Sequence, residues 1–114
     1  ILIMPLINIT TSAKVFDKKS LLKKSSKLIS SLTKKSENFV MVRLEDCSKM
    51  FFAGSTEDCC YIELKSIGSI DPPKMSEEIT KFFSLEIGVP TERIYINFIN
   101  IEASMWSWNK STFG

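Results

Sequence analysis

The chain of 114 residues contains no histidine. Its absence excludes nucleophile activation by a histidine, metal binding through imidazole and proton transfer by a histidine side chain. Any acid–base chemistry near neutral pH must therefore come from another group.

Cysteine is scarce as well, and the three cysteines are Cys47, Cys59 and Cys60. Their number is odd and they form no C-x-x-C spacing, which argues against a disulfide framework and against a zinc site. We expect buried or unreactive thiols, and we expect no metal and no cofactor.

Long apolar runs and a strong charge of either sign are also missing. No apolar run approaches the roughly 20 residues that a membrane span needs. The segment from Ile1 to Ile9 is too short, and too interrupted by Pro5 and Asn8, for a signal peptide. The 15 basic and 13 acidic residues leave a net charge of +2, which gives no strong case for nucleic acid or membrane. The sequence therefore predicts a soluble protein made in the cytosol, with neither nucleic acid nor membrane as a partner.

The chain does contain a regular succession of strand and helix patterns. Strands are expected at 6–10, 39–44, 60–67 and 94–99. The mostly apolar run at 39–44 is typical of a strand covered on both faces. Apolar residues at helical spacing predict two helices, the first capped by Asp17 and the second capped by Ser76 and ended by Gly88.

The first predicted helix carries a lysine-rich polar side. Its lysines are Lys18, Lys19, Lys23, Lys24 and Lys27. The run fits either a nucleic-acid patch or a solvated helix face. We favour the solvated face because acidic residues elsewhere nearly cancel the charge.

The predicted elements follow the order β-α-β-β-α-β, and the two halves look alike at a repeat of roughly 55 residues. This order predicts one α+β domain of two layers, with a four-stranded sheet and both helices on one face. Tyr61, Tyr95 and Asn97 are candidates for the open face of the sheet. In a domain of 114 residues, a neighbouring subunit is a natural cover for that face.

This element order permits two classes of function. An RNA-recognition domain has the same order and stacks bases on aromatic residues of its open sheet face. The third strand, 60–67, lacks the Gly-aromatic motif of such domains, and the net charge is modest. A trimeric enzyme or ligand-binding protein is therefore favoured.

The segment Met4-Pro5-Leu6-Ile7 raises a separate question. If Pro5 lies inside the chain, its nitrogen is a tertiary amide that can act neither as a base nor as a nucleophile. Pro5 then serves only to open a strand. If removal of Met4 frees it at a terminus, Pro5 becomes a secondary amine that can act as a base. On this second interpretation residues 1–4 are an N-terminal extension and residues 5–114 form the single domain.

Several spaced motifs coincide with this proline. They are Met4-Pro5-Leu6-Ile7, Lys35 shortly before Phe39-Val40, Ser66-Ile67-Gly68, Arg93-Ile94-Tyr95-Ile96-Asn97, and Trp108-Asn109-Lys110-Ser111-Thr112-Phe113. Together they resemble the macrophage migration inhibitory factor family, which includes D-dopachrome tautomerase and belongs to the tautomerase superfamily. The similarity covers essentially Met4 to Gly114.

The resemblance implies a homotrimer with active sites between subunits, and keto–enol tautomerisation of small aromatic keto acids and enols of the phenylpyruvate or dopachrome type. It implies Pro5 as the catalytic base, with Lys35 and the Ile67 N–H on the same subunit and Tyr95 and Asn97 on the adjacent one. The implied aromatic enclosure is formed by Phe39, Tyr95, Trp108 and Phe113.

The resemblance leaves a second function open. Family members can act outside the cell as cytokine-like ligands, exported without a signal peptide, so a host cell-surface receptor is the alternative partner. Phe39 stands where animal members often have tyrosine, and the C-x-x-C of the animal cytokine is not reproduced. We therefore do not extend thiol-oxidoreductase activity to this chain.

Overall fold

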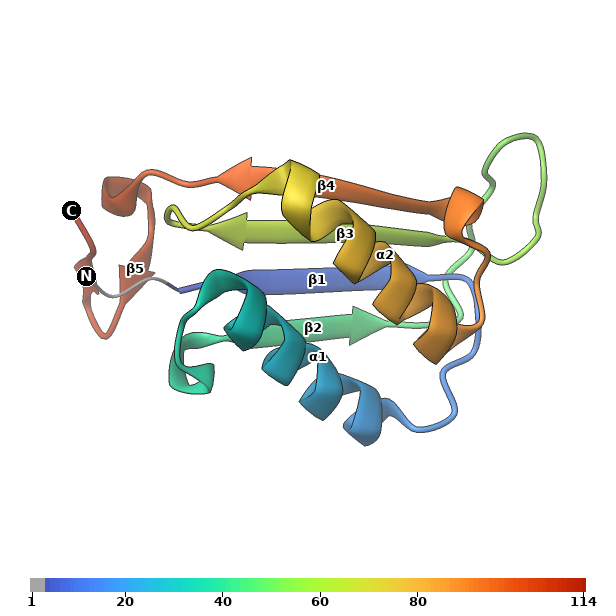
Figure 1. The fold of residues 1–114 in the computed structure, drawn as a ribbon, viewed down its shortest axis with the longest axis horizontal. Coiled ribbons are helices and arrows are strands. Elements are labelled where there is room, and N and C mark those ends of the chain that lie inside the picture. The colour runs from blue at the N-terminus through green and yellow to red at the C-terminus, as the bar shows by residue number, and fades with distance from the viewer. Residues whose placement is uncertain (1–3) are drawn as a thin grey trace.

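The computed structural model describes residues 4–114 and has two layers, a four-stranded sheet and two helices that cover one of its faces (Figure 1). The main elements are β1 Leu6–Thr11, α1 Lys18–Thr33, β2 Met41–Glu45, β3 Cys60–Ser66, α2 Pro72–Ile87 and β4 Ile94–Asn100. The predicted α+β class and element order are confirmed. Three of the four residues assigned to an N-terminal extension, Ile1 to Ile3, lie outside the described residues.

The sheet is assembled from two similar halves. Its strand order is β2-β1-β3-β4, with β1 parallel to β2, β3 parallel to β4, and β1 antiparallel to β3. Each half is thus a β-α-β unit whose two strands are direct neighbours, and the halves join at the centre of the sheet. This arrangement is the pseudo-repeat that the sequence predicts.

The core lies between the sheet and the helices because the central strands alternate. On β1 and β3 every second residue is buried, and these residues face the apolar stripes of α1 and α2. Phe83 and Ile79 of α2 are fully buried, as is Ile29 of α1. Burial of each such side chain is worth roughly 1.5–3 kcal/mol, so this single core accounts for the fold of a small domain.

The helix boundaries agree with the sequence at α1 and differ at α2. Asp17 caps α1 by accepting a hydrogen bond of 3.0 Å from the N–H of Ser20. Helix α2 begins at Pro72, so the predicted cap at Ser76 is wrong. Two prolines in the first turn start the helix earlier, since their fixed φ suits it and they lack the N–H groups that would need partners. Gly88 ends α2 in a left-handed conformation with φ of 83°, as predicted.

Strand β2 departs from the expectation of a strand covered on both faces. It forms an edge of the sheet, starts at Met41 and has alternating exposed and half-buried residues. Phe39 lies before it in a short 3-10 helix, Glu37–Phe39. The charged residues Arg43 and Glu45 are exposed, a common protection of an edge strand against unwanted pairing.

The C-terminal segment forms a separate hairpin of two short strands, β5 Ser107–Trp108 and β6 Ser111–Thr112. Figure 1 shows this tail at the end of the sheet where β1 begins. Within residues 4–114, neither helix has the length and apolar character needed to cross a bilayer.

Candidate functional site

Pro5 lies immediately before β1 and its side chain is fully buried. Its carbonyl accepts a hydrogen bond of 3.0 Å from the N–H of Met41, which ties it to the first residue of β2. The pairing of Leu6 with Lys65 brings Pro5 close to the last residue of β3, Ser66. Pro5 therefore stands where the beginnings of β1 and β2 meet the end of β3.

Lys35 reaches the same end of the sheet through the C-terminus of α1. Lys34 has a left-handed conformation with φ of 57° and ends the helix. The N–H of Lys35 then donates to the Ser30 carbonyl at 3.1 Å, and the Ser30 hydroxyl donates to the Lys35 carbonyl. These bonds fix the backbone of Lys35 at the turn that leads into β2. Lys35 is half-buried.

Ile67 follows β3 directly and begins the turn beside Pro5. The N–H of Gly68, the next residue, donates to the side-chain oxygen of Asn100 at 2.9 Å. Gly68 has φ of 75°, a conformation that favours glycine. Together, the turn and the Asn100 contact hold Ile67 at the Pro5 end of the sheet.

Three predicted aromatic residues also gather toward this end. The rings of Phe39 and Trp108 meet edge to face with centroids 6.4 Å apart. The N–H of Phe113 donates to the carbonyls of Ala103 at 3.2 Å and Trp106 at 3.1 Å. The tail thereby folds back on itself at the end of the sheet where β1 begins (Figure 1).

Tyr95 lies at the opposite end of the sheet from Pro5. It pairs with Tyr61, which pairs with Thr10. Thr10 is five residues from Pro5 along β1, a separation of about 17 Å at the usual rise of a strand. Asn97 is two residue pairs nearer, beside Glu63, and is still displaced from Pro5. A single chain therefore does not bring all the predicted site residues together.

The surroundings of Tyr95 are held by Arg93, a buried residue that the sequence marked only as part of a motif. Its guanidinium donates to four main-chain carbonyls, those of Phe52, Ser55, Glu57 and Asp58, at 2.8 to 3.4 Å. It also lies 5.1 Å from the centre of the Phe52 ring, and that ring meets Tyr95 at 4.7 Å. A buried arginine amid a loop of polar residues has no distinctive sequence signal, which explains why its role was missed.

The open face of the sheet carries a polar network near Asn97. The Asn97 side chain donates to the Tyr61 hydroxyl at 3.3 Å, and that hydroxyl donates to Glu63 at 2.9 Å. Tyr95 is 62% exposed on this face. These residues lie on the open side, as the sequence predicts, and are available to a neighbouring molecule.

Perturbed acid–base groups occur at the Tyr95 end. Burial raises the pKa of the Cys60 thiol to about 12, and the neighbouring Cys59 adds to the shift. A hydrogen bond from the Val15 N–H, at 2.9 Å, holds the pKa of the Asp46 carboxyl below its usual 3.8. Cys59 and Cys60 are buried and Cys47 is exposed, so the prediction of buried thiols holds for two of the three. Residues 4–114 contain no cluster of three or more His, Cys, Asp or Glu side chains that could hold a metal.

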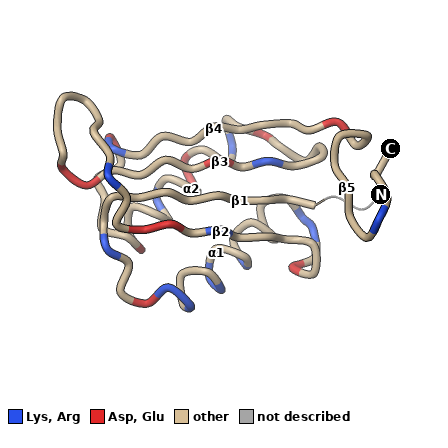
Figure 2. The backbone as a smooth tube through the Cα atoms, turned by 180° about the vertical axis from the view of Figure 1, so that it is seen from behind, with Lys and Arg blue, Asp and Glu red and all other residues tan. Residues whose placement is uncertain are grey.

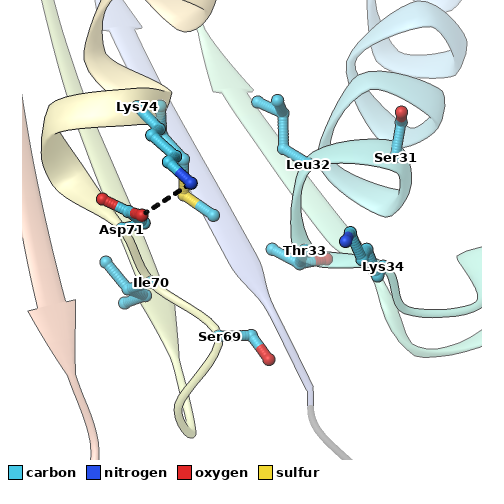
Figure 3. A pocket seen from close by; sticks show the side chains of 9 residues that line it. Ser31, Leu32, Thr33, Lys34, Ser69, Ile70, Asp71 and Lys74 are labelled. Carbon is cyan, nitrogen blue, oxygen red and sulfur yellow. Dashed lines mark ion pairs between the residues drawn. The ribbon is translucent and has the colours of Figure 1, made fainter.

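A cavity of about 500 Å³ opens between the end of α1 and the start of α2. Figure 3 shows Lys34 on one side and the ion pair of Lys74 with Asp71, at 3.9 Å, on the other. It adjoins the Pro5 end of the sheet, but its lining includes neither Pro5 nor Lys35. We therefore assign the candidate site to the Pro5 end and not to this cavity.

This domain, with two β-α-β halves and a proline before its first strand, is of the class found in the tautomerase superfamily. The family profile described as "Macrophage migration inhibitory factor (MIF)" matches residues 4–114. The chain belongs to the MIF family, and this membership supports a tautomerase or cytokine function in general terms.

Relatives and solved structures agree with this assignment. The chain is similar to the macrophage migration inhibitory factor homolog of Brugia malayi, with 36% identity over 82% of this chain and 84% of the relative. It is 31% identical to the homolog of Trichinella spiralis, over 96% of this chain and all of the relative. The crystal structure of a homologue from Prochlorococcus marinus superposes with a TM-score of 0.91 at 42% identity, covering 96% of this chain and 99% of that one.

Proposed function

We propose that the protein is a keto–enol tautomerase that acts on small aromatic keto acids and enols of the phenylpyruvate or dopachrome type. The observation that carries the proposal is the position of Pro5, buried where β1, β2 and β3 meet, with the backbone of Lys35 and Ile67 at the same end. Family membership supports isomerase chemistry of this kind.

The chemistry follows from the properties of a terminal secondary amine. An α-amine has a reference pKa of about 7.7–8.0. Apolar surroundings and the positive charge of Lys35 both disfavour its protonated form and so lower that pKa. A neutral Pro5 amine can remove an acidic proton from the carbon beside the keto group, and the resulting ammonium can return it at the other position.

The other predicted residues have roles that suit a keto acid. Lys35 binds the substrate carboxylate, and the Ile67 N–H and the Asn97 amide orient its oxygens. Phe39, Trp108 and Phe113 enclose the aromatic ring together with Tyr95. This proton transfer needs neither a metal nor a cofactor.

A homotrimer is part of the proposal because one subunit holds only half of the site. Tyr95 and Asn97 are far from Pro5 in their own subunit, so an adjacent subunit must supply them. The open sheet face and the exposed Tyr95 offer surface for such contacts. Sedimentation equilibrium should report a trimer at micromolar concentration; a monomer would contradict the proposal.

The decisive experiment concerns the residues that precede Pro5. We propose that residues 1–4 are an extension whose removal frees the Pro5 nitrogen. A chain that begins at Pro5 should show tautomerase activity in a spectrophotometric enol–keto assay, whereas the chain with Ile1 to Met4 attached should be nearly inactive. Intact-mass measurement must confirm both N-termini. Equal activity of the two proteins would overturn Pro5 as the base.

Cytokine-like signalling is the second candidate function. The names of the relatives, macrophage migration inhibitory factor and its homologs, favour it. In this role the protein acts outside the cell and binds a host cell-surface receptor. A receptor-binding assay on Pro5→Gly protein separates the two functions, since retained binding with lost tautomerase activity would show that signalling does not need the base.

A further inference from the structure

Helix α1 presents a row of lysines on the side that faces away from the core. Lys19, Lys23 and Lys27 follow one another at intervals of four residues and are exposed. The opposite side of the helix is buried through Leu21, Ser25, Ile29 and Thr33. We call the three exposed lysines the α1 basic face. Since α1 lies on the helix side of the sheet (Figure 1), this face points away from the open side where Tyr95 lies.

The net charge of +2 hides a strong separation of charge. Residues 17–35 contain seven lysines and one aspartate, a net charge of +6, while the rest of the chain has eight basic and twelve acidic residues, a net charge of −4. In Figure 2 basic segments recur along α1. The sequence-based argument against an anionic partner rested on the net charge of the whole chain, so it does not hold for this helix.

Ion pairs leave the α1 basic face uncompensated. Lys18 pairs with Asp46 at 3.4 Å, and Lys24 pairs with Glu86 at 3.2 Å. Within residues 4–114, none of the three lysines of the basic face has an acidic partner within 4.0 Å. Three positive charges at successive turns therefore face solvent.

Two large apolar side chains are exposed where the start of α1 and the end of α2 lie together. Phe16, just before α1, is 87% exposed, and Leu85 of α2 is 84% exposed. The Lys24–Glu86 pair joins the two helices next to Leu85. Phe16 and Glu86 also line one cavity of about 300 Å³, so the start of α1 and the end of α2 lie together. The outer surface thus combines a basic helix face with exposed aromatic and aliphatic residues.

We propose that this surface docks on an anionic lipid surface. Lysines on a helix face are attracted to anionic headgroups, while exposed aromatic and aliphatic side chains enter the boundary between headgroups and acyl chains. A polyanionic polysaccharide would use the lysines but would gain little from Phe16 and Leu85. The proposal does not depend on the tautomerase function, because none of these residues belongs to the candidate site.

Vesicle flotation of the full chain tests the proposal. We expect the protein to float with phosphatidylcholine vesicles that contain about 30% phosphatidylserine at about 0.1 M salt, to float poorly with pure phosphatidylcholine, and to be released by high salt. Changing Lys19, Lys23 and Lys27 together to Gln should lower the partition coefficient on the order of 100-fold.

A matched variant distinguishes binding through the α1 basic face from an effect of net charge alone. Lys49, Lys74 and Lys81 are exposed lysines outside α1, and changing all three to Gln gives the same net charge. This control should retain most of the binding, with unchanged circular dichroism in both triple variants. Equal losses in the two triple variants, or no flotation of the intact chain with anionic vesicles, would overturn the proposal.

A double variant tests the apolar component. The double variant Phe16→Ser and Leu85→Ser should bind anionic vesicles several-fold more weakly, because the interfacial contact is lost. Unchanged vesicle binding by this variant, together with displacement of the intact protein by soluble heparin, would identify a polyanion site and overturn the lipid assignment.

Discussion

The two ends of the sheet differ in how they hold their functional residues. At one end Pro5 is fully buried, and hydrogen bonds of the backbone fix the turns around it. At the other end Tyr95 is 62% exposed, and the buried Arg93 organises the loop beside it. One end is buried and fixed by hydrogen bonds, and the other is exposed surface. In the proposed trimer, these two different ends of neighbouring chains would together form one site.

The strongest test removes the base from the Pro5 end. In a chain that begins at residue 5, Pro5→Gly should lower kcat about 100- to 10,000-fold, the usual contribution of a positioned general base. Tautomerase kinetics measure the loss, and sedimentation checks that the oligomer persists. Activity within a few-fold of the parent would place the base elsewhere.

Mixed oligomers test whether the two ends belong to one site. Pro5→Gly and Tyr95→Ala proteins should each be weakly active alone. Trimers reassembled from equal amounts should recover about a quarter of the parent activity, because about one interface in four then combines an intact Pro5 with an intact Tyr95. A mixture no more active than the average of the two separate proteins would show that the half-sites do not combine across subunits.

Lys35→Ala sharpens the description of the Pro5 end. Loss of the charge should raise KM for a phenylpyruvate-type acid about tenfold, since a charge-assisted hydrogen bond to the carboxylate is lost. The KM for a methyl ester of the same substrate should change little, which makes the ester the matched control. Equal changes for the acid and the ester would exclude Lys35 as the carboxylate ligand.

At the Tyr95 end, Arg93→Lys should destabilise the loop at 52–58. Lysine keeps the charge but cannot reach four carbonyls at once, so we expect a loss of about 1–3 kcal/mol in the free energy of unfolding. Urea denaturation measures it, with the exposed Arg43→Lys as the control. If both variants lose the same stability, the carbonyl contacts of Arg93 do not hold the loop.

The sequence predicts more of the fold than of the site. The alternation of apolar and polar residues in β1 and β3 and the apolar stripes of the helices were enough to predict the fold class. They are local patterns that a sequence shows directly. The edge position of β2 depends on which strands are neighbours, which the sequence does not show. Its apolar run therefore wrongly predicted a strand covered on both faces. The early start of α2 depends on Pro72 and Pro73, whose effect competes with a good cap at Ser76.

The site was predicted through a family resemblance, since its parts are distant along the chain. Pro5, Lys35 and Ile67 become neighbours only through the pairing of three strands. The expected placement of Tyr95 on an adjacent subunit likewise came from the resemblance, and the strand register shows only that Tyr95 is far from Pro5 within one chain. Arg93 carries no pattern of its own, because its partners are main-chain carbonyls that any sequence would provide.

The thiols at the Tyr95 end should have no effect on stability near neutral pH and should affect it only in alkaline solution. The pKa of Cys60 is raised from its usual 9.0 to about 12 in the folded protein. Between these values the unfolded chain releases the thiol proton while the folded chain keeps it. The free energy of unfolding should therefore be independent of this group below pH 9 and should fall as the pH rises toward 12. Because tyrosines and lysines also titrate there, the measurement is the difference in urea denaturation between the parent and Cys60→Ala, followed from pH 8 upward. A difference that stays constant with pH would show that Cys60 ionises equally well in both states.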